Sequence, residues 1–351
     1  MRIGPRYDNA TERIGAALNM VPVPVGLAMF GMPIARMLQV AQRTGVFREL
    51  ASANGPLAAG ELAQRLGLRE QGLALLLDAL CVSDVLRCER DGRYALPRRT
   101  AKWLDPASAS YVGDFVADTA HYWEWWAGLE ELVRDGTHVE LHDKPADDPY
   151  WRSYITGQYQ LARLSSAAVA RAVGLAPDAT SLLDVAGAHG EFSMACCRRH
   201  PQLQATVVDL PGSARIGREI VAAAGMSARV RHVEGDMLAT DLGGPHDGAL
   251  AFNIVHHLSP EQAKALFARI AATLKPGVPL CVLDLYDRPA GERPDNGSLL
   301  GLFFHLTSGA DTYAIPEVAR WLAESGFGPT KAKRLPQIPG LALLRAERVA
   351  S

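Results

Sequence analysis

Five short apolar segments that alternate with helical stretches dominate the sequence after Thr180, and they restrict the fold more than any other feature. They cover residues 181–185, 205–210, 230–234, 247–253 and 279–285. Helical stretches such as 260–274 separate most of them. Alternation of this kind is typical of a largely parallel, doubly wound sheet. We therefore predict an α/β domain in the C-terminal half of the chain.

The region from about residue 33 to 110 shows a helical pattern instead. A short helix over 56–63, a turn at Gly67 and a leucine-rich helix over 71–83 predict a helix-turn-helix. The dipeptide Asp91-Gly92 lies between two short apolar runs and predicts a β-hairpin. Together these elements indicate a winged-helix unit.

Winged helices often bind DNA, but the second helix of this one has almost no Arg, Lys or Asn side chain that could reach base edges. The net charge of -2 gives no sign of an electrostatic grip on nucleic acid either. We favour a helix buried in a dimer interface over a DNA-reading helix. A small or neutral molecule is the partner that this composition fits better.

Aromatic residues are concentrated in a helical zone between about residues 111 and 175. They are Tyr111, Phe115, Tyr122, Trp123, Trp125, Trp126, Tyr150, Trp151, Tyr154 and Tyr159. They are compatible with packing between domains and equally with the wall of an aromatic substrate pocket, because such pockets are mostly apolar. We predict a winged-helix dimerisation domain over 1–110, a helical linker lining the substrate pocket over 111–175, and the α/β domain over 176–351.

The cysteines and the N-terminal residues indicate the cellular compartment in which we expect the protein. The five cysteines are odd in number and form no Cys-x-x-Cys pair, which argues against a disulfide framework or a zinc site and favours a reducing cytoplasm. We predict no metal ion. Charged residues of both signs precede the first apolar run, so we expect that the N-terminus is not a signal peptide. Prolines and glycines interrupt the apolar stretch 20–32, so we expect it to be too short and broken to span a membrane.

A loop of small residues, from Asp184 to Gly190, follows the first predicted strand and precedes a helix over 191–199. Small residues let the backbone approach a ligand closely, although sites for NAD also use such a loop. Acidic residues then end the first three strands: Asp184, Asp209 and, within Gly235-Asp236-Met237, Asp236. The carboxyl ends of parallel strands meet at one edge of a sheet, where ligands bind.

Three carboxylates suit S-adenosyl-L-methionine better than a dinucleotide. This cofactor has no phosphate, and it presents an ammonium group, a ribose diol and an adenine amino group, all of which are donors that carboxylates accept. Asp209 is placed for the ribose, and Asp236 for the adenine beside an apolar contact from Met237. The expected cofactor-binding residues are Asp184, Ala186, Gly187, Gly190, Asp209, Leu210, Asp236, Met237 and Asn253.

From about residue 35 to its end, the sequence resembles the class I S-adenosylmethionine-dependent O-methyltransferases of the caffeate and hydroxyindole type, and especially their bacterial small-molecule members. The family's DVGGGxG loop corresponds to 184–190, with alanine at two glycine places. Its VxDLP motif corresponds to 207–211, and its G-D-hydrophobic element to 235–237. The resemblance implies a Rossmann-like methyltransferase domain of the α/β class, an N-terminal α-helical winged-helix dimerisation domain, and a homodimer.

The same resemblance assigns catalytic roles. His256 takes the place of the family's catalytic histidine, His257 replaces the aspartate that follows it, and Asp284 matches the supporting acid, one methylene shorter than the usual glutamate. A second family acid is matched by Asp311, one position off. His256 is expected to act as the general base on a phenolic hydroxyl. The expected substrate-binding residues are Trp126, Tyr154, Gln158, His257, Leu302, Phe303 and Leu306.

Two other functions remain open from the sequence. The first is an S-adenosylmethionine-binding enzyme of the same fold that carries out hydroxylation, decarboxylation or a pericyclic rearrangement instead of methylation. The altered pair of His256 and His257 and the aromatic zone are compatible with this. The second is a transcription regulator that uses the winged helix, which the lack of a basic face on its second helix disfavours.

Overall fold

The computed structural model describes residues 9–18, 20, 22–287, 296–336 and 340–350. They form two compact units, Met1–His121 and Tyr122–Ser351. The aromatic zone expected over 111–175 is not a unit of its own, because its first part belongs to the N-terminal unit and the remainder to the C-terminal one.

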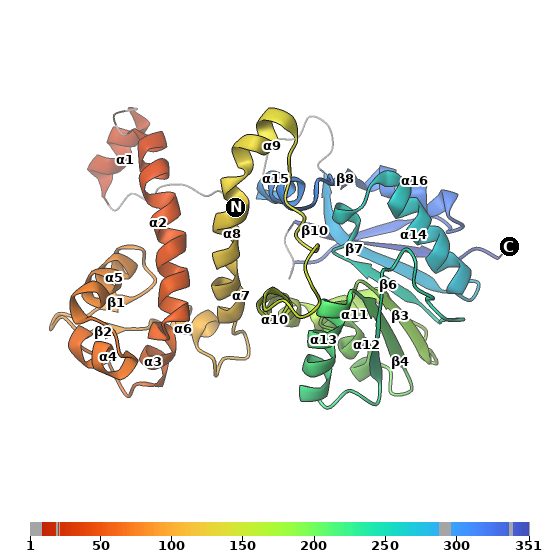
Figure 1. Ribbon diagram of the computed structural model, residues 1–351, viewed down its shortest axis with the longest axis horizontal. Helices are drawn as coiled ribbons and strands as arrows, with labels where there is room; N and C mark the ends of the chain where they lie inside the picture. The colour runs from red at the N-terminus through yellow and green to blue at the C-terminus, as the bar shows by residue number, and fades with distance from the viewer. Residues whose placement is uncertain (1–8, 19, 21, 288–295, 337–339, 351) are drawn as a thin grey trace. The chain divides into compact units, whose positions relative to one another are not determined.

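The N-terminal unit is mainly helical (Figure 1). Its elements are α1 (Ala10–Ala17), α2 (Val23–Arg43), α3 (Val46–Ser52), α4 (Ala59–Leu66), α5 (Glu70–Val82), β1 (Arg87–Cys88), β2 (Tyr94–Ala95), α6 (Arg98–Leu104), α7 (Gly113–Asp118) and the 3-10 helix η1 (Thr119–His121). Strands β1 and β2 pair in an antiparallel hairpin. The two helices and the hairpin predicted from the sequence are therefore present. Their apolar faces meet in a core that includes Phe47, Leu62, Leu77 and Leu80.

Helix α2 differs from the expectation for the apolar stretch 20–32. Instead of being broken, that stretch enters one continuous helix of 21 residues, because Pro24 lies in the first turn, where its missing N–H costs nothing, and Pro33 is tolerated inside the helix. By length and mean hydropathy alone, α2 is able to cross a membrane. Only Gln39 and Ala41 of this helix are buried in the single chain, so its apolar face lacks a cover within the N-terminal unit.

The C-terminal unit is built around a mixed sheet. Its strands are β3 (Ser181–Val185), β4 (Gln204–Asp209), β5 (Val230–Glu234), β6 (Ala249–Phe252), β7 (Pro279–Asp287), β8 (Tyr313–Ala314), β9 (Lys331–Arg334) and β10 (Leu341–Glu347). They follow the order β5-β4-β3-β6-β7-β10-β9, and β8 pairs with β7. The five predicted strands β3 to β7 are parallel to one another. Strands β9 and β10, which the sequence reading did not identify, extend the sheet antiparallel.

Helices cover both faces of this sheet, as Figure 1 shows for the C-terminal unit. The helices of this unit are α8 (Tyr122–Ala127), α9 (Leu129–Asp135), α10 (Tyr150–Arg163), α11 (Ser166–Val173), α12 (Glu191–Arg199), α13 (Pro211–Ala223), the 3-10 helix η2 (Val255–His257), α14 (Pro260–Thr273), α15 (Asn296–Ser308) and α16 (Ile315–Glu324). Leu183 and Val185 pack with α14 and α16, whereas Leu182 packs with α11 and α12 on the other face. This alternation follows from the two-residue period of a strand. The unit has the Rossmann-like fold expected from the sequence.

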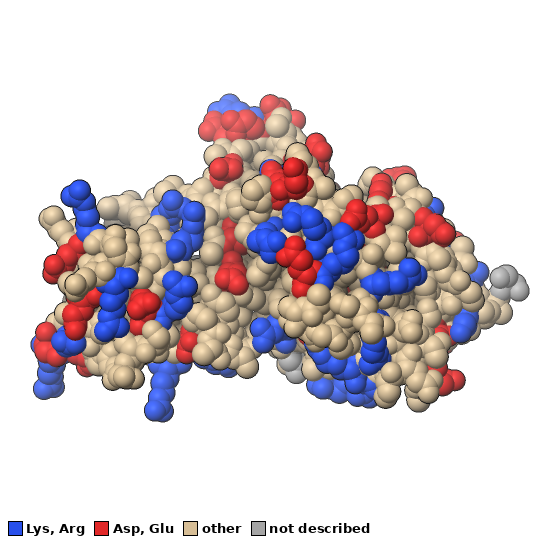
Figure 2. Space-filling model, turned by 60° about the horizontal axis from the view of Figure 1, so that its bottom comes forward, with Lys and Arg blue, Asp and Glu red and all other residues tan. Residues whose placement is uncertain are grey.

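On the face drawn in Figure 2, charged side chains do not separate by sign. Figure 2 shows basic and acidic residues side by side over the face that it draws. Several lie in ion pairs within the chain, such as Arg152 with Glu219 at 2.8 Å and Arg134 with Glu130 at 2.5 Å. This face therefore offers no broad field of one sign to a charged polymer.

Candidate active site

A cavity of about 480 Å³ opens at the carboxyl ends of the parallel strands. Strand β3 contributes Asp184, β4 contributes Asp209, and the turn after β5 contributes Asp236. Side chains from α10 and η2 complete its wall, among them Tyr154 and His257. The three acidic residues predicted to gather at one edge of the sheet therefore do so.

Asp184 is the most enclosed of the three acids, with 1% of its surface exposed. The Ser193 hydroxyl, from the first turn of α12, donates to its Oδ2 at 2.6 Å. Its Oδ1 is buried without a hydrogen-bond partner among the described residues. Burial raises the pKa of Asp184 to about 7. A buried carboxylate oxygen with no partner fits a site that receives an ammonium group.

The loop after Asp184 allows a close approach of the backbone. A Cβ atom at Gly187 would lie 2.4 Å from the carboxyl carbon of Asp184, so no larger residue fits there without moving the acid. The two alanines that replace family glycines, Ala186 and Ala188, have φ angles of 55° and 43°. Alanine adopts this left-handed conformation at a cost of roughly 1–2 kcal/mol. Two hydrogen bonds hold it here: Ala186 N–H donates to Val208 O and Ala188 N–H to Asp209 Oδ2.

Asp209 and Asp236 differ in exposure. Asp209 is half-buried, accepts from Ala188 N–H and Leu210 N–H, each at 2.7 Å, and has its pKa raised to about 6 by burial. Both of its oxygens retain a further lone pair for a diol. Asp236 is exposed at the rim, where its Oδ1 accepts from Leu238 N–H at 2.8 Å. Beside it, the half-buried Met237 supplies an apolar contact surface.

These residues fit S-adenosylmethionine. The donor set of that molecule is matched by an enclosed acid with an unpartnered oxygen, a half-buried acid with spare lone pairs and an acid at the rim beside an apolar side chain. Gly187 keeps the space beside Asp184 open. The geometry thus agrees with the cofactor expected from the sequence.

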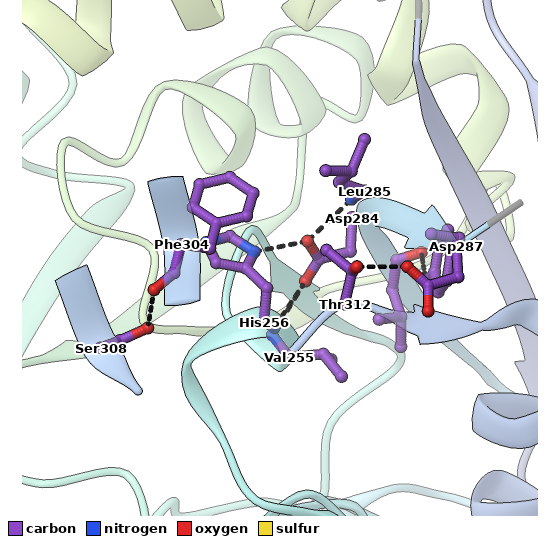
Figure 3. Close-up of polar contacts among 10 residues, drawn as sticks. Val255, His256, Asp284, Leu285, Asp287, Phe304, Ser308 and Thr312 are labelled. Atoms are coloured by element: carbon purple, nitrogen blue, oxygen red, sulfur yellow. Dashed lines mark hydrogen bonds and ion pairs between the residues drawn. The ribbon is translucent and has the colours of Figure 1, made fainter. Parts of the chain in front are cut away.

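His256 and Asp284 form a buried pair next to this cavity (Figure 3). Asp284, in β7, accepts from His256 Nδ1 at 2.5 Å and from the Val255 and Leu285 N–H groups, each at 2.8 Å. Since the carboxylate accepts, Nδ1 carries the proton and Nε2 is the basic nitrogen of the neutral ring. Phe304 of α15 stacks on the imidazole, with 3.8 Å between ring centroids and 17° between ring planes. This arrangement can orient a proton-accepting histidine.

His257, and not His256, reaches the cavity wall. The two rings lie 4.1 Å apart between centroids. His142, from the loop between α9 and α10, also lines the cavity and meets His257 edge to face at 4.8 Å. Burial lowers the pKa of His142 to about 4 and that of His257 well below its usual range. Both imidazoles are therefore neutral near pH 7.

Asp311 lies elsewhere. Its side chain is 72% exposed and pairs with His305 Nδ1 at 3.1 Å, and neither residue lines the cavity of about 480 Å³. The adjacent Thr312 hydroxyl donates to Asp287, the last residue of β7, as Figure 3 shows. The structure does not bring Asp311 to His256, because the chain after α15 directs it towards His305 and not towards η2.

The other predicted residues divide between the cavity and its surroundings. Those that line the cavity are Asp184, Ala186, Gly187, Asp209, Leu210, Asp236, Met237, Asn253, Tyr154, Gln158 and His257. Gly190 instead caps α12 with a left-handed φ of 70°. Phe303 packs against Tyr122, Trp125 and Trp126. Leu306 is fully buried, and Leu302 faces a second depression near the end of β7.

Sequence reasoning missed His142, and it did not identify Ser193 as the residue that holds Asp184. His142 follows no motif, and its loop lies in a stretch that the pattern of aromatic residues marks only in general terms. Ser193 would have been recognisable from its place one turn into the helix that follows the loop of small residues. Trp151, named among the aromatic residues, also lines the cavity.

Two family models match the sequence. Residues 136–328 match the model of an O-methyltransferase domain, and residues 28–105 match that of an O-methyltransferase dimerisation domain. The first match contains the acidic residues of the cavity together with His256 and Asp284.

Curated relatives align over most of the chain. The sequence is 29% identical over 314 residues to 3-hydroxy-5-methyl-1-naphthoate 3-O-methyltransferase from Streptomyces sahachiroi, covering 87% of this chain and 89% of that one. It is 30% identical over 310 residues to the tetracenomycin polyketide synthesis 8-O-methyl transferase from Streptomyces glaucescens, covering 84% and 89%. The crystal structure of human N-acetylserotonin methyltransferase in complex with SAM has the same fold, with a TM-score of 0.83, 18% identity and coverage of 99% and 100%.

Proposed function

The chain belongs to the O-methyltransferase family, and we propose that it transfers the methyl group of S-adenosylmethionine to a phenolic hydroxyl of an aromatic natural product. Both bacterial relatives described above are named as O-methyltransferases, one of a hydroxynaphthoate and one in polyketide synthesis. The observation that carries the proposal is the buried pair of His256 and Asp284 next to a cavity that three acids line.

The residues divide the work between binding and proton transfer. When bound, S-adenosylmethionine supplies an electrophilic methyl group on a sulfonium centre. Asp184, Asp209 and Asp236 accept from its ammonium, ribose and adenine groups and fix its orientation. Orientation of the reactants alone contributes several kcal/mol to the lowering of the barrier.

His256 acts as the general base in this proposal. A phenol has a pKa near ~10, so removal of its proton at neutral pH benefits from a base. His256 Nε2 takes the proton, while Asp284 at 2.5 Å from Nδ1 holds the ring and stabilises the imidazolium. The stacked Phe304 ring limits the rotation of the imidazole.

Transfer of label from the methyl group of S-adenosylmethionine to a panel of phenols tests the function. We expect labelled methyl ether with the wild-type protein and a loss of about 10² to 10⁴ in kcat for His256→Ala, with the affinity for S-adenosylhomocysteine unchanged. His305→Ala, which removes a histidine outside the cavity, is the matched control and should keep wild-type kcat. Label that stays on the cofactor with every phenol, or undiminished kcat in His256→Ala, would contradict the proposal.

We also infer that the helix-turn-helix and hairpin of the N-terminal unit form a winged helix that mediates homodimerisation. The match of residues 28–105 to a dimerisation domain supports this, as does the uncovered apolar face of α2. A cytoplasmic location is consistent with the reduced state of the five cysteines, none of which is in a disulfide.

A further inference from the structure

The wall of the cavity around His257 carries polar groups that the proposed methyl transfer does not use. His142 Nε2 lies 3.4 Å from the Tyr154 hydroxyl, and the His142 ring lies parallel to Trp151 at 6.2 Å between centroids. These contacts fix the imidazole from two sides. His142 in turn meets His257 edge to face at 4.8 Å. The result is an ordered pair of imidazoles facing the cavity.

One ring nitrogen of His257 lacks a hydrogen-bond partner within the described part of the chain. Its Nδ1 is buried and has no partner among the described residues. A neutral imidazole has one donor and one acceptor nitrogen, so Nδ1 lacks either an acceptor or a donor, whichever tautomer is present. Leaving a buried polar atom unpaired is unfavourable, and such atoms are usually satisfied by a ligand or water. Because His257 lines the cavity, the acceptor molecule is the natural source of that partner.

The position of His257 limits where on the acceptor this partner lies. The imidazoles of His256 and His257 are 4.1 Å apart between centroids and come from consecutive residues of η2. If His256 holds the hydroxyl that is methylated, the closeness of the two rings places the atom bound by His257 near that hydroxyl. On an aromatic ring system, the neighbouring positions are the ortho position and, in fused rings, the peri position.

We propose that His257 and His142 recognise a second oxygen substituent on the acceptor, ortho or peri to the hydroxyl that is methylated. The proposal rests on the proposed function, because it takes His256 as the residue that holds the reacting hydroxyl. His257 makes the hydrogen bond, and His142 is a positioning residue that holds the His257 ring edge-on and is itself held by Tyr154 and Trp151. A neutral pair can donate to a carbonyl oxygen or exchange hydrogen bonds with a hydroxyl.

Binding of matched phenols to the full-length protein saturated with S-adenosylhomocysteine tests this without requiring turnover. The probes are 2,3-dihydroxynaphthalene against 2-naphthol, and 1,8-dihydroxynaphthalene against 1-naphthol, measured by calorimetry. We expect the wild type to bind at least one diol about tenfold more tightly than its mono-ol. The preference should fall to about one in His257→Phe and decrease in His142→Phe, because both variants keep an aromatic ring and lose the nitrogens. His138→Phe, on the same loop but outside the cavity lining, should keep the preference.

The outcomes separate this inference from the proposed function. Equal affinities of diol and mono-ol in the wild type, no binding of any probe, or an unchanged preference in both variants would each overturn the inference. None of these results depends on methyl transfer. Failure of label transfer with an intact and histidine-dependent diol preference would instead overturn the proposed function and leave the recognition site standing.

Discussion

At the residue scale, the loop after β3 departs from the family's glycine motif at two positions. Ala186 and Ala188 stand where the family has glycine, and the structure places both at positive φ, where alanine is strained. The strained residues lie in a loop that two hydrogen bonds tie to β4, one to Val208 O and one to the Asp209 carboxylate. Gly187, one of the two positions of this loop that stay glycine, is the one where a Cβ would collide with Asp184.

Asp184 predicts how cofactor affinity depends on pH. Its pKa is raised from 3.8 to about 7 by burial, so in the free protein it stabilises the fold below pH 3.8 and this contribution is lost as pH rises through about 7. A cationic ammonium binds the ionised form. We therefore expect the affinity for S-adenosylhomocysteine, measured by calorimetry, to rise about fifteenfold between pH ~6 and ~7.5, of which the ionisation of Asp184 accounts for about eightfold.

Two variants check the assignment of this pH dependence. Asp184→Asn should bind more weakly and keep only the rise of about twofold that Asp209 contributes, since burial raises the pKa of Asp209 to about 6. Asp236→Asn, which removes an exposed acid, should bind more weakly with the full pH dependence retained. A pH profile of Asp184→Asn identical to that of the wild type would remove Asp184 from the ammonium site.

The positions of His142 and Asp311 could not be predicted from the sequence. Both depend on the path of a loop that no local pattern specifies: the segment between α9 and α10 carries His142 into the cavity, and the segment after α15 carries Asp311 to His305. His256 and Asp284 were predicted from the family resemblance, and the structure brings them together because the strands before and around them, β6 and β7, are neighbours in the sheet. Residues on regular elements could thus be placed from the sequence, and those on long connections could not.

At the element scale, the five strands that alternate with helices were predicted, whereas the antiparallel pair β9 and β10 was missed. Strand β10 is as apolar and buried as the predicted strands, so composition does not explain why it was missed. Strands β3, β4, β6 and β7 are apolar and buried over most of their length, as expected of parallel strands that are covered on both faces, whereas β5 at the edge reads Val-Arg-His-Val-Glu and is buried only at Val230. Strand β9 reads Lys-Ala-Lys-Arg and is exposed along its length, so it lacks the hydrophobic signal of a strand. Its place at the edge of the sheet explains this composition, because charged residues protect an edge from pairing with other chains.

The N-terminal cap of helix α14 is expected to stabilise the neighbouring turn that carries His256 and His257. Its start is fixed by a capping box: Ser259 Oγ accepts from Gln262 N–H at 3.2 Å, and Gln262 Oε1 accepts from Ser259 N–H at 2.9 Å. The cap follows η2 almost directly, so it anchors the turn that carries His256 and His257. We expect Ser259→Ala to lower the free energy of unfolding by about 1 kcal/mol and to lower kcat a few-fold.

Urea denaturation followed by circular dichroism measures the first effect as a shift in midpoint at constant slope. Ser259→Asp keeps a side-chain acceptor at the cap and should restore both the midpoint and kcat. An unchanged midpoint in Ser259→Ala would mean that the capping box adds nothing to the stability of the C-terminal unit.

At the scale of the whole molecule, the two units differ in how much of their apolar surface is buried. The C-terminal unit buries most of its large apolar residues on both faces of one sheet, and those that stay exposed include Val133, Leu164 and three leucines of α15. The N-terminal unit leaves large apolar side chains of α1 and α2 in contact with solvent, among them Ile14, Leu18, Met29, Phe30 and Met32. Exposed apolar surface of this extent marks a face that another surface covers. The prolines in the stretch 20–32 suggested a broken segment and so concealed the exposed apolar face of α2. In the structure the prolines of α2 do not interrupt the helix.

A second copy of the chain is the cover that we expect for α2. Phe30 is 59% exposed, and it lies within residues 28–105, which match the dimerisation domain. A charge placed there would be buried without a partner in a dimer, which is strongly unfavourable. In sedimentation analysis we therefore expect a dimer for the wild type and an increase of at least about a hundredfold in the dimer dissociation constant for Phe30→Glu. Val133→Glu, at a position that is 76% exposed and outside that domain, should remain dimeric. A monomeric wild type that sediments with phospholipid vesicles would instead assign the apolar face of α2 to a membrane surface.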